Sequence, residues 1–178
     1  MRIRNFRQED TPTLIQLQQL ALQADERRMQ DTVEFEAWLN SPSLDARSNL
    51  FVITDDDDDL NTWGQAGTLE GIEGEIVGYT VVQLNQKQGS YHLLCEGTVH
   101  PEFRRQNAGR ALLICALNRA RVIAADFEFE AEQEGLPVYF EALLPANDPA
   151  STRLAEKCEM QPTDESTLDG MQLYRREL

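Results

Sequence analysis

Two β-strand patterns joined by a short turn, followed by a long helical pattern, constrain the fold of this chain most strongly. Ile76 to about Leu84 and Ser90–Val99 are rich in apolar and β-branched residues, which favour strands. The segment 85–89 between them has turn-forming residues at both ends, and Gly89 suits a positive φ. The two strands are therefore predicted to form an antiparallel hairpin. From Asn107 onward, apolar residues recur at alternating steps of four and three, which predicts one helix that continues to Gln133.

The remaining segments also alternate between strand and helix patterns. Further strands are predicted at Ile3–Phe6, Leu50–Thr54, Val138–Leu144 and Met171–Tyr174. Further helices are predicted from Thr11 (N-cap, followed by Pro12) to about Gln23, over Val33–Leu39, and from Asp148 (N-cap, followed by Pro149) to about Cys158. Strands followed by helices, with a hairpin between, indicate an α/β (α+β) fold with a mixed sheet covered by helices. The length favours a single domain over residues 1–178.

The charge of the chain limits the partners that it can bind. It has 31 Asp and Glu against 16 Lys and Arg, which gives a formal net charge of −15 at pH 7. Such a chain repels nucleic-acid phosphates and anionic lipid surfaces, and it attracts cations such as amines and basic peptides. We therefore expect no nucleic-acid partner and no membrane partner.

The sequence contains no targeting or metal-binding signal. No segment reaches the ~18 consecutive apolar residues of a spanning helix, and the basic N-terminus lacks the apolar run of a signal peptide. Both observations favour a cytoplasmic location. Cys95, Cys115 and Cys158 are far apart and form no CxxC or Cys/His cluster. They are expected to be small buried side chains, with no disulfide framework and no metal site.

The segment Thr98–Leu113 carries the clearest chemical signal. A strand ends at Val99, Pro101 disfavours its continuation, and a turn with the small residues Ala108 and Gly109 leads directly into the long helix. The first helical turn has backbone N–H groups without internal partners, and with the helix dipole these form a site suited to a diphosphate. Positive charge is added locally by Arg104, Arg105 and Arg110.

This segment resembles the acyl-CoA loop of the GNAT superfamily of N-acetyltransferases. The family pattern is Arg or Gln, two residues of any type, Gly, any residue, then Gly or Ala, and residues 104–109 read Arg-Arg-Gln-Asn-Ala-Gly. The lead-in at 99–104 and the following residues 110–113 also match. One position departs from the pattern, because Asn107 stands where the first Gly is usual. Asn tolerates a positive φ better than most residues, so we expect the turn to survive.

The resemblance implies a mostly antiparallel sheet of about six to seven strands and an enzyme that uses acetyl-CoA. The acetyl group would move to a primary amine by direct attack in a ternary complex, without a covalent enzyme intermediate. The acceptor would be a small molecule or a peptide, and a cationic one would suit the charge of the chain. A homodimer is left open. The residues expected at acetyl-CoA are Thr98, Val99, Arg104, Arg105, Gln106, Asn107, Ala108, Gly109, Arg110, Asn147 and Asp148.

The resemblance and the reaction chemistry together suggest catalytic residues. Attack on a thioester needs a neutral amine, so a base must remove a proton from it. Glu96, three residues before Val99 on the fourth strand, is the first candidate base, and Glu141 on the fifth strand is the second. His92 and His100 are weaker alternatives. The backbone N–H near Val99 would stabilise the oxyanion, at a point where the family's fourth and fifth strands separate.

The family's acid, a tyrosine in the fourth helix, has no counterpart here. Aligning residues 154–160 with the family's helix motif places Ala155 at the tyrosine position, Ser151 at an Ala/Ser position, and Asp148 at the position of an Asn that contacts pantetheine. Asn147 is one residue away and could take that place. Tyr139 and Tyr174 remain possible substitutes for the acid.

Three readings of the function stay open at this point. The first is an enzyme, with the acidic run Asp55–Asp59 either facing a cationic acceptor or forming a solvated loop. The second is a GNAT-like module that binds acyl-CoA without turnover. The third is an unrelated α/β protein whose helix N-terminus binds another phosphate ligand.

Overall fold

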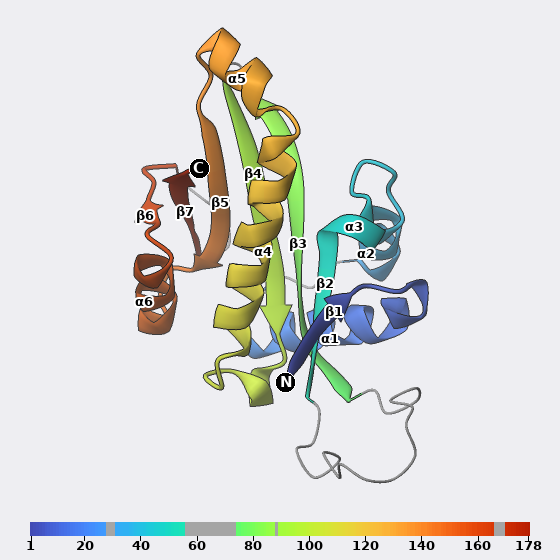
Figure 1. Ribbon diagram of the computed structural model, residues 1–178. Coiled ribbons are helices and arrows are strands. Elements are labelled where there is room, and N and C mark those ends of the chain that lie inside the picture. The colour runs from blue at the N-terminus through green and yellow to red at the C-terminus, as the bar shows by residue number, and fades with distance from the viewer. Residues whose placement is uncertain (28–30, 56–73, 88, 166–169) are drawn as a thin grey trace, which may run out of the picture.

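A single sheet organises the part of the chain that the structure describes. The computed structural model describes residues 1–27, 31–55, 74–87, 89–165 and 170–178. Within these ranges seven strands form one sheet in the order β1-β2-β3-β4-β5-β7-β6 (Figure 1). Neighbouring strands are antiparallel except for β4 and β5, which are parallel. The predicted mixed, mostly antiparallel sheet flanked by helices is confirmed.

The strands and helices of the described ranges have the following bounds. The strands are β1 (Arg2–Asn5), β2 (Leu50–Asp55), β3 (Glu75–Lys87), β4 (Ser90–Val99), β5 (Val138–Pro145), β6 (Gln161–Pro162) and β7 (Met171–Glu177). The helices are η1 (Gln8–Asp10), α1 (Thr11–Ala24), α2 (Thr32–Leu39), α3 (Ala46–Asn49), η3 (Pro101–Phe103), α4 (Ala108–Ala125), α5 (Glu128–Glu134) and α6 (Pro149–Lys157).

Helices cover both faces of the sheet, and each face has its own apolar core. Successive side chains of a strand point to opposite faces, so Val81 and Val82 of β3 enter different cores although both are fully buried. Val82 packs in the core that contains Leu113 of α4 and Ala155 of α6. Val81 packs in the core that contains Leu14 of α1 and residues of α2. The long helix α4 lies across β3 and β4 in Figure 1, and α1 lies behind the sheet.

The prediction of one continuous helix from Asn107 to Gln133 is wrong. α4 ends at Ala125 and α5 begins at Glu128, with Phe127 between them at φ −130° and ψ 12°. The Phe127 ring stacks on the ring of Tyr91 at the start of β4, with centroids 4.6 Å apart. This packing turns the chain at a point where the sequence periodicity continues. Gly135 ends α5 as its C-cap, with a φ of 65°.

Four short elements, η1, α3, η3 and β6, were not predicted. Each has only two to four residues, too few to produce a periodic pattern. The predicted positive φ at Gly89 is confirmed at 83°. Asp55 ends β2, while the rest of the acidic run, residues 56–59, lies outside the described residues.

The structure also bears on membranes and metals. No helix in the described ranges combines the length and hydropathy needed to cross a bilayer. Among the same residues, no group of three or more His, Cys, Asp or Glu side chains gathers where it could hold a metal ion.

Candidate active site

The sheet opens where the two parallel strands part. β4 and β5 pair from Tyr91↔Val138 to Cys95↔Ala142, and the pairing stops there although both strands continue, to Val99 and Pro145. The last four residues of β4 therefore have β3 on one side and an opening on the other.

Two backbone N–H groups of β4 are directed into this opening. The N–H of Tyr91 donates to the Pro137 carbonyl on the β5 side (3.0 Å), whereas the N–H of His100 donates to the Val77 carbonyl on the β3 side (2.8 Å). N–H groups alternate in direction along a strand, so those of Gly97 and Val99 point the same way as that of Tyr91. Donors in this position suit an oxyanion that forms within the opening.

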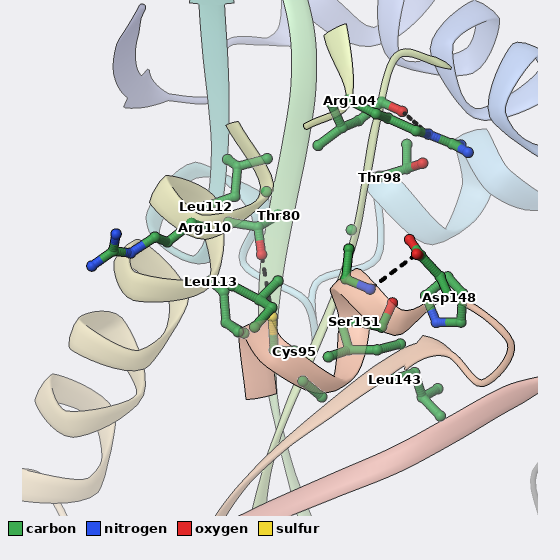
Figure 2. Close-up of a pocket in the computed structure, with 18 of the residues that line it drawn as sticks. Thr80, Cys95, Thr98, Arg104, Arg110, Leu112, Leu113, Leu143, Asp148 and Ser151 are labelled. Carbon is green, nitrogen blue, oxygen red and sulfur yellow. Dashed lines mark hydrogen bonds between the residues drawn. The ribbon is translucent and has the colours of Figure 1, made fainter. Parts of the chain in front are cut away.

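A cleft of about 480 Å³ lies on the α4 side of the opening. We call it the α4–α6 cleft, because residues of both helices line it together with residues of the two parted strands. Figure 2 shows Thr98 of β4, Leu143 of β5 and Ser151 of α6 around this space. Its lining comprises Asp25, Arg27, Tyr79, Thr80, Cys95, Gly97, Thr98, Val99, Arg104, Arg105, Asn107, Gly109, Arg110, Leu112, Leu113, Ala142, Leu143, Leu144, Pro145, Asp148, Ala150, Ser151, Arg153, Leu154, Lys157 and Met171.

The N-terminus of α4 forms one end of the cleft. Asn107 precedes the helix with a φ of 69°, so the turn has the left-handed geometry expected where the family has Gly. The Ala111 N–H donates to the Asn107 carbonyl at 3.0 Å. The N–H groups of Ala108, Gly109 and Arg110 lie ahead of this bond and have no acceptor within the helix. Together with the helix dipole they form an anion-binding end.

Positive charge is concentrated around the cleft. Six of the chain's 16 basic residues line it, against two acidic residues, Asp25 and Asp148. Arg104 forms a two-pronged ion pair with Asp25 at the end of α1, and its Nε donates to the Val99 carbonyl at 3.1 Å (Figure 2). Arg105 is more exposed and contacts Asp148 at 3.4 Å. An anion as highly charged as a diphosphate is thus favoured here in an otherwise acidic molecule.

The two residues predicted to contact the cofactor just before α6 lie in different places. Asp148 lines the cleft and caps α6, because its carboxylate accepts a hydrogen bond from the Ala150 N–H at 3.0 Å. Ser151 is buried and also lines the cleft. Asn147 is exposed and lies outside the lining, as do Gln106 and the buried Ala108 of the predicted loop.

A second cavity, of about 260 Å³, lies on the opposite face of the sheet. We call it the α1–α2 pocket. Seven residues belong to both cavities, so the two meet at the opening between β4 and β5. The pocket is lined by Gln18, Ala21, Leu22, Asp25, Arg27, Phe35, Trp38, Tyr79, Glu96, Gly97, Thr98, Leu143 and Met171.

Glu96 is the titratable base candidate at the junction of the two cavities. It lines the α1–α2 pocket next to Gly97 and Thr98, which line both. Burial raises the pKa of the Glu96 carboxyl, and the positive charge of Arg27 partly offsets this rise. A raised pKa brings a carboxylate nearer to the basicity that proton transfer from an amine requires.

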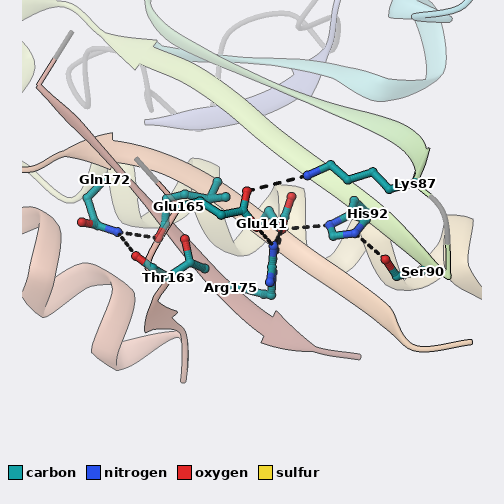
Figure 3. Close-up of polar contacts among 9 residues, drawn as sticks. Lys87, Ser90, His92, Glu141, Thr163, Glu165, Gln172 and Arg175 are labelled. Atoms are coloured by element: carbon teal, nitrogen blue, oxygen red, sulfur yellow. Dashed lines mark hydrogen bonds and ion pairs between the residues drawn. The ribbon is translucent and has the colours of Figure 1, made fainter. Parts of the chain in front are cut away.

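Glu141 occupies a different place. It lines neither cavity, and its nearly fully buried carboxylate lies 2.9 Å from His92 Nδ1 and is paired with Arg175 (Figure 3). The other ring nitrogen of His92 lies 2.7 Å from Ser90 Oγ. Arg175 also pairs with Glu165, which is half exposed. The two residues that were suggested as alternative bases on β4 and β5 are therefore partners in one buried polar network.

The other suggested residues lie apart from the junction. His100 caps η3, where its Nδ1 accepts a hydrogen bond from the Glu102 N–H. The Tyr139 ring packs under the Arg175 guanidinium, and the Tyr174 hydroxyl lies 3.2 Å from Thr152 Oγ1. Ala155, at the family's tyrosine position, is fully buried in the core.

Cys95 lines the α4–α6 cleft, in surroundings that disfavour its reactive thiolate form. Burial raises the pKa of its thiol to about 12, although the hydrogen bond with Thr80 opposes the rise (Figure 2). A thiol with that pKa stays protonated at neutral pH, and only the thiolate attacks.

Several cavity residues were not predicted from the sequence. Arg153 and Lys157 lie on α6, where charged residues of an amphipathic helix normally face water. The sequence did carry a signal for these two residues. Asp148 and Pro149 mark the start of the helix, and a spacing of four places Arg153 and Lys157 on one face of it. Arg27, Phe35, Trp38 and Tyr79 carry no local motif, and only the packing of α1 and α2 on the sheet brings them to the opening.

Comparison with known proteins is consistent with this geometry. The chain matches the model of the acetyltransferase (GNAT) family over residues 16–159. No curated protein has a significantly similar sequence.

Similar solved structures cover almost the whole chain. The yncA protein of Salmonella typhimurium, solved with its cofactor acetyl-CoA, has a TM-score of 0.61 at 15% identity, over 99% of this chain and 92% of that one. A ribosomal-protein-alanine N-acetyltransferase of Brucella melitensis has a TM-score of 0.60 at 17% identity, over 100% of both chains. An N-acetyltransferase of Staphylococcus aureus Mu50 has a TM-score of 0.61 at 16% identity, over 99% and 97%. At these identities the likeness concerns the fold.

Proposed function

This chain belongs to the GNAT family of acetyltransferases, and we propose that it transfers the acetyl group of acetyl-CoA to a primary amine. The observation that carries the proposal is the opening between β4 and β5, which joins an anion-binding cleft on one face of the sheet to a smaller pocket with a buried carboxylate on the other. A donor and an acceptor that enter from the two faces would meet there.

The α4–α6 cleft fits the chemistry of acetyl-CoA. The diphosphate would bind the N–H groups of Ala108, Gly109 and Arg110 at the start of α4, where the helix dipole favours negative charge. The thioester is the activated acetyl group that the reaction consumes. The apolar strand residues of the cleft, such as Leu143 and Leu144, would cover the pantetheine arm as it approaches the opening.

The junction residues would carry out the proton transfer and stabilise the charge. The Glu96 carboxylate would take a proton from the ammonium or amine of the acceptor, directly or through one water molecule. The neutral nitrogen then attacks the thioester carbonyl, and the N–H groups of Val99 and Gly97 would stabilise the resulting oxyanion. Collapse of this species breaks the C–S bond and releases the CoA thiolate, which takes up a proton.

Transfer without a covalent enzyme intermediate is supported by the state of Cys95. It is the cysteine that lines the cleft, and its raised pKa keeps it protonated. With Ala155 at the family's tyrosine position, no phenol from α6 would protonate the thiolate. CoA thiolate is a fair leaving group, so we propose that turnover proceeds without this acid.

A thiol-release assay tests the proposed reaction. Acetyl-CoA is supplied with a panel of polyamines, amino acids, aminoglycosides and peptides, and release of free CoA is followed. We expect a rate on the order of 1 s⁻¹ or faster for at least one acceptor, within the usual range for enzymes. Tight acetyl-CoA binding without thiol release across the panel would favour a binding module instead.

Replacing Gly109 by glutamate is expected to weaken acetyl-CoA binding by about 100-fold. The side chain would place a negative charge beside the diphosphate site, where like charges repel by a few kcal/mol at an effective dielectric constant of ~20. The same charge in the first turn of α4 favours the helix, so the melting temperature should not fall. Calorimetry of CoA binding and a thermal melt measure the two effects.

Gly109→Ala is the matched control for this variant. A Cβ at position 109 meets only Val99 Cγ2, at the ordinary contact distance of 3.9 Å, so the fold tolerates it. The alanine variant should bind CoA far more tightly than the glutamate variant. Equal and unchanged CoA affinity in both variants would mean that the diphosphate binds elsewhere.

A further inference from the structure

Arg27 is a charged residue of the α1–α2 pocket that the proposed reaction leaves unused. It lines both cavities, next to the opening. Its Nε is buried, and no hydrogen-bond partner for this atom exists among the residues that the structure describes. A buried guanidinium N–H without a partner is costly, so in a cavity it needs an acceptor atom from a water molecule or a ligand.

The acidic residues of the pocket do not neutralise Arg27. Asp25 is occupied by its two-pronged ion pair with Arg104. Glu96 feels the charge of Arg27 but forms no ion pair with it within 4.0 Å in the described structure. Among the described residues, the pocket therefore presents a carboxylate at the opening and, on its wall, a separate guanidinium without an ion-pair partner.

An aromatic cluster forms another wall of the same pocket. The Phe35 ring lies 5.4 Å from the Trp38 ring and 6.1 Å from the Tyr79 ring, measured between centroids. All three residues line the pocket together with the apolar side chains of Leu22, Leu143 and Met171. The Tyr79 hydroxyl already donates a hydrogen bond to Gln18 Oε1 at 2.8 Å, so this wall is largely apolar toward a ligand.

The size of the pocket limits what it can hold. Its volume of about 260 Å³ is below the ~300–1,000 Å³ of pockets that take drug-sized ligands. The pocket suits a compact molecule, and the guanidinium opposes a polycation inside it. This conflicts with the cationic acceptor that the net charge of the whole chain suggests.

We propose that the acceptor is a small amine that carries a carboxylate, namely an α-amino acid with an apolar or aromatic side chain. This inference rests on the proposed acetyl transfer. The amino group lies at the opening beside Glu96, the carboxylate accepts hydrogen bonds from Arg27, and the side chain packs against Phe35 and Trp38. Planar carboxylates pair well with a guanidinium, which presents several N–H donors in a fixed plane.

Matched amines that differ at the carboxylate test the proposal. We compare kcat/KM for L-phenylalanine, its amide, 2-phenylethylamine and spermidine, with acetyl-CoA saturating. L-Phenylalanine should exceed its amide and 2-phenylethylamine by about 10- to 100-fold, the usual effect of one charged hydrogen bond. A preference for the uncharged analogues or for spermidine would overturn the proposal. A preference for a dipeptide such as Phe-Gly over L-phenylalanine would do the same.

Substitution of Arg27 separates carboxylate recognition from a general loss of function. Each variant is assayed on the high-pH plateau of its rate profile, because Arg27 also lowers the pKa of Glu96. There Arg27→Gln should lower kcat/KM for L-phenylalanine by about 10- to 100-fold more than for 2-phenylethylamine, and Arg27→Lys should restore part of this difference. Arg121→Gln, an exposed change on α4 outside both cavities, is the control. An equal loss for both substrates in Arg27→Gln would show that Arg27 does not read the carboxylate.

Binding measurements keep this inference distinct from the proposed reaction. L-Phenylalanine and 2-phenylethylamine are titrated into wild type and Arg27→Gln, with and without CoA, in a calorimeter. Carboxylate-dependent binding that Arg27→Gln removes would support the pocket assignment even if no acetyl transfer occurred. Turnover of amines without any carboxylate preference would leave the proposed reaction standing and refute the assignment of the pocket.

Discussion

Replacing Glu96 by glutamine is expected to lower kcat by about 100-fold or more, while acetyl-CoA affinity stays within about 2-fold of wild type. The amide keeps the shape of the side chain at the junction of the two cavities but cannot accept the proton of the amine. General-base catalysis contributes typically ~10²–10⁴-fold. Steady-state rates with a fixed amine and calorimetry with CoA measure the two effects.

The pH dependence gives a second readout of the same residue. Burial raises the pKa of Glu96, and the base must be ionised, so the wild-type rate should rise as the pH rises through this raised pKa. The Gln variant should lack that limb of the profile. A carboxyl whose pKa is higher in the folded than in the unfolded state contributes stability at low pH, and this is lost as the pH rises through the folded-state pKa. The Gln variant should therefore be at least as stable as wild type at neutral pH.

Controls make the Glu96 result specific. Glu132→Gln, on the exposed part of α5, should change neither rate nor stability. A Glu96→Gln protein that retains the wild-type rate and pH profile would remove Glu96 from the role of base. A large loss of CoA affinity would instead indicate damage to the α4–α6 cleft.

Replacing Glu141 by alanine should lower the free energy of unfolding by about 3–5 kcal/mol. Its carboxylate is buried between His92 and Arg175, and removing it leaves both without their shared partner (Figure 3). Breaking a buried ion pair by removing one partner costs about this much. Urea denaturation followed by circular dichroism measures the change, and the activity of the folded fraction should persist, because Glu141 lines neither cavity.

Glu165 provides the matched comparison for Glu141. It pairs with the same Arg175, but its side chain is 49% exposed against 3% for Glu141. An exposed ion pair contributes ~0–1 kcal/mol to stability, so Glu165→Ala should lower the free energy of unfolding by no more than about 1 kcal/mol. Equal effects of the two alanine variants would mean that burial does not set the energetics of this network.

The local parts of the site could be predicted from the sequence because short-range chemistry determines them. Pro101 and the small residues after it fix the end of β4 and the start of α4, and Asn107 takes its left-handed conformation within the turn itself. Asp148 and Pro149 define the start of α6 in the same way. The β3–β4 hairpin also followed from the sequence, because turn-forming residues join two strand patterns directly.

The long-range parts could not be predicted, because no nearby residue signals them. Glu96 and Glu141 both lie on strands, and the sequence around them does not distinguish their roles. Only the folded structure shows that Glu96 lines a cavity and that Glu141 forms a buried ion pair with Arg175. Arg27 reaches the opening because α1, which ends three residues before it, packs on β3 and β4. The break after α4 depends on an aromatic contact between Phe127 and Tyr91, which are 36 residues apart in the chain.

The parting of β4 and β5 has a kinetic consequence. The α4–α6 cleft and the α1–α2 pocket open on opposite faces of the sheet. A ligand bound in one cavity therefore leaves the entrance of the other cavity open. If the proposed donor and acceptor bind on opposite faces, we expect no required order of substrate binding or product release. Product-inhibition patterns of a random mechanism would be the signature of this two-sided access.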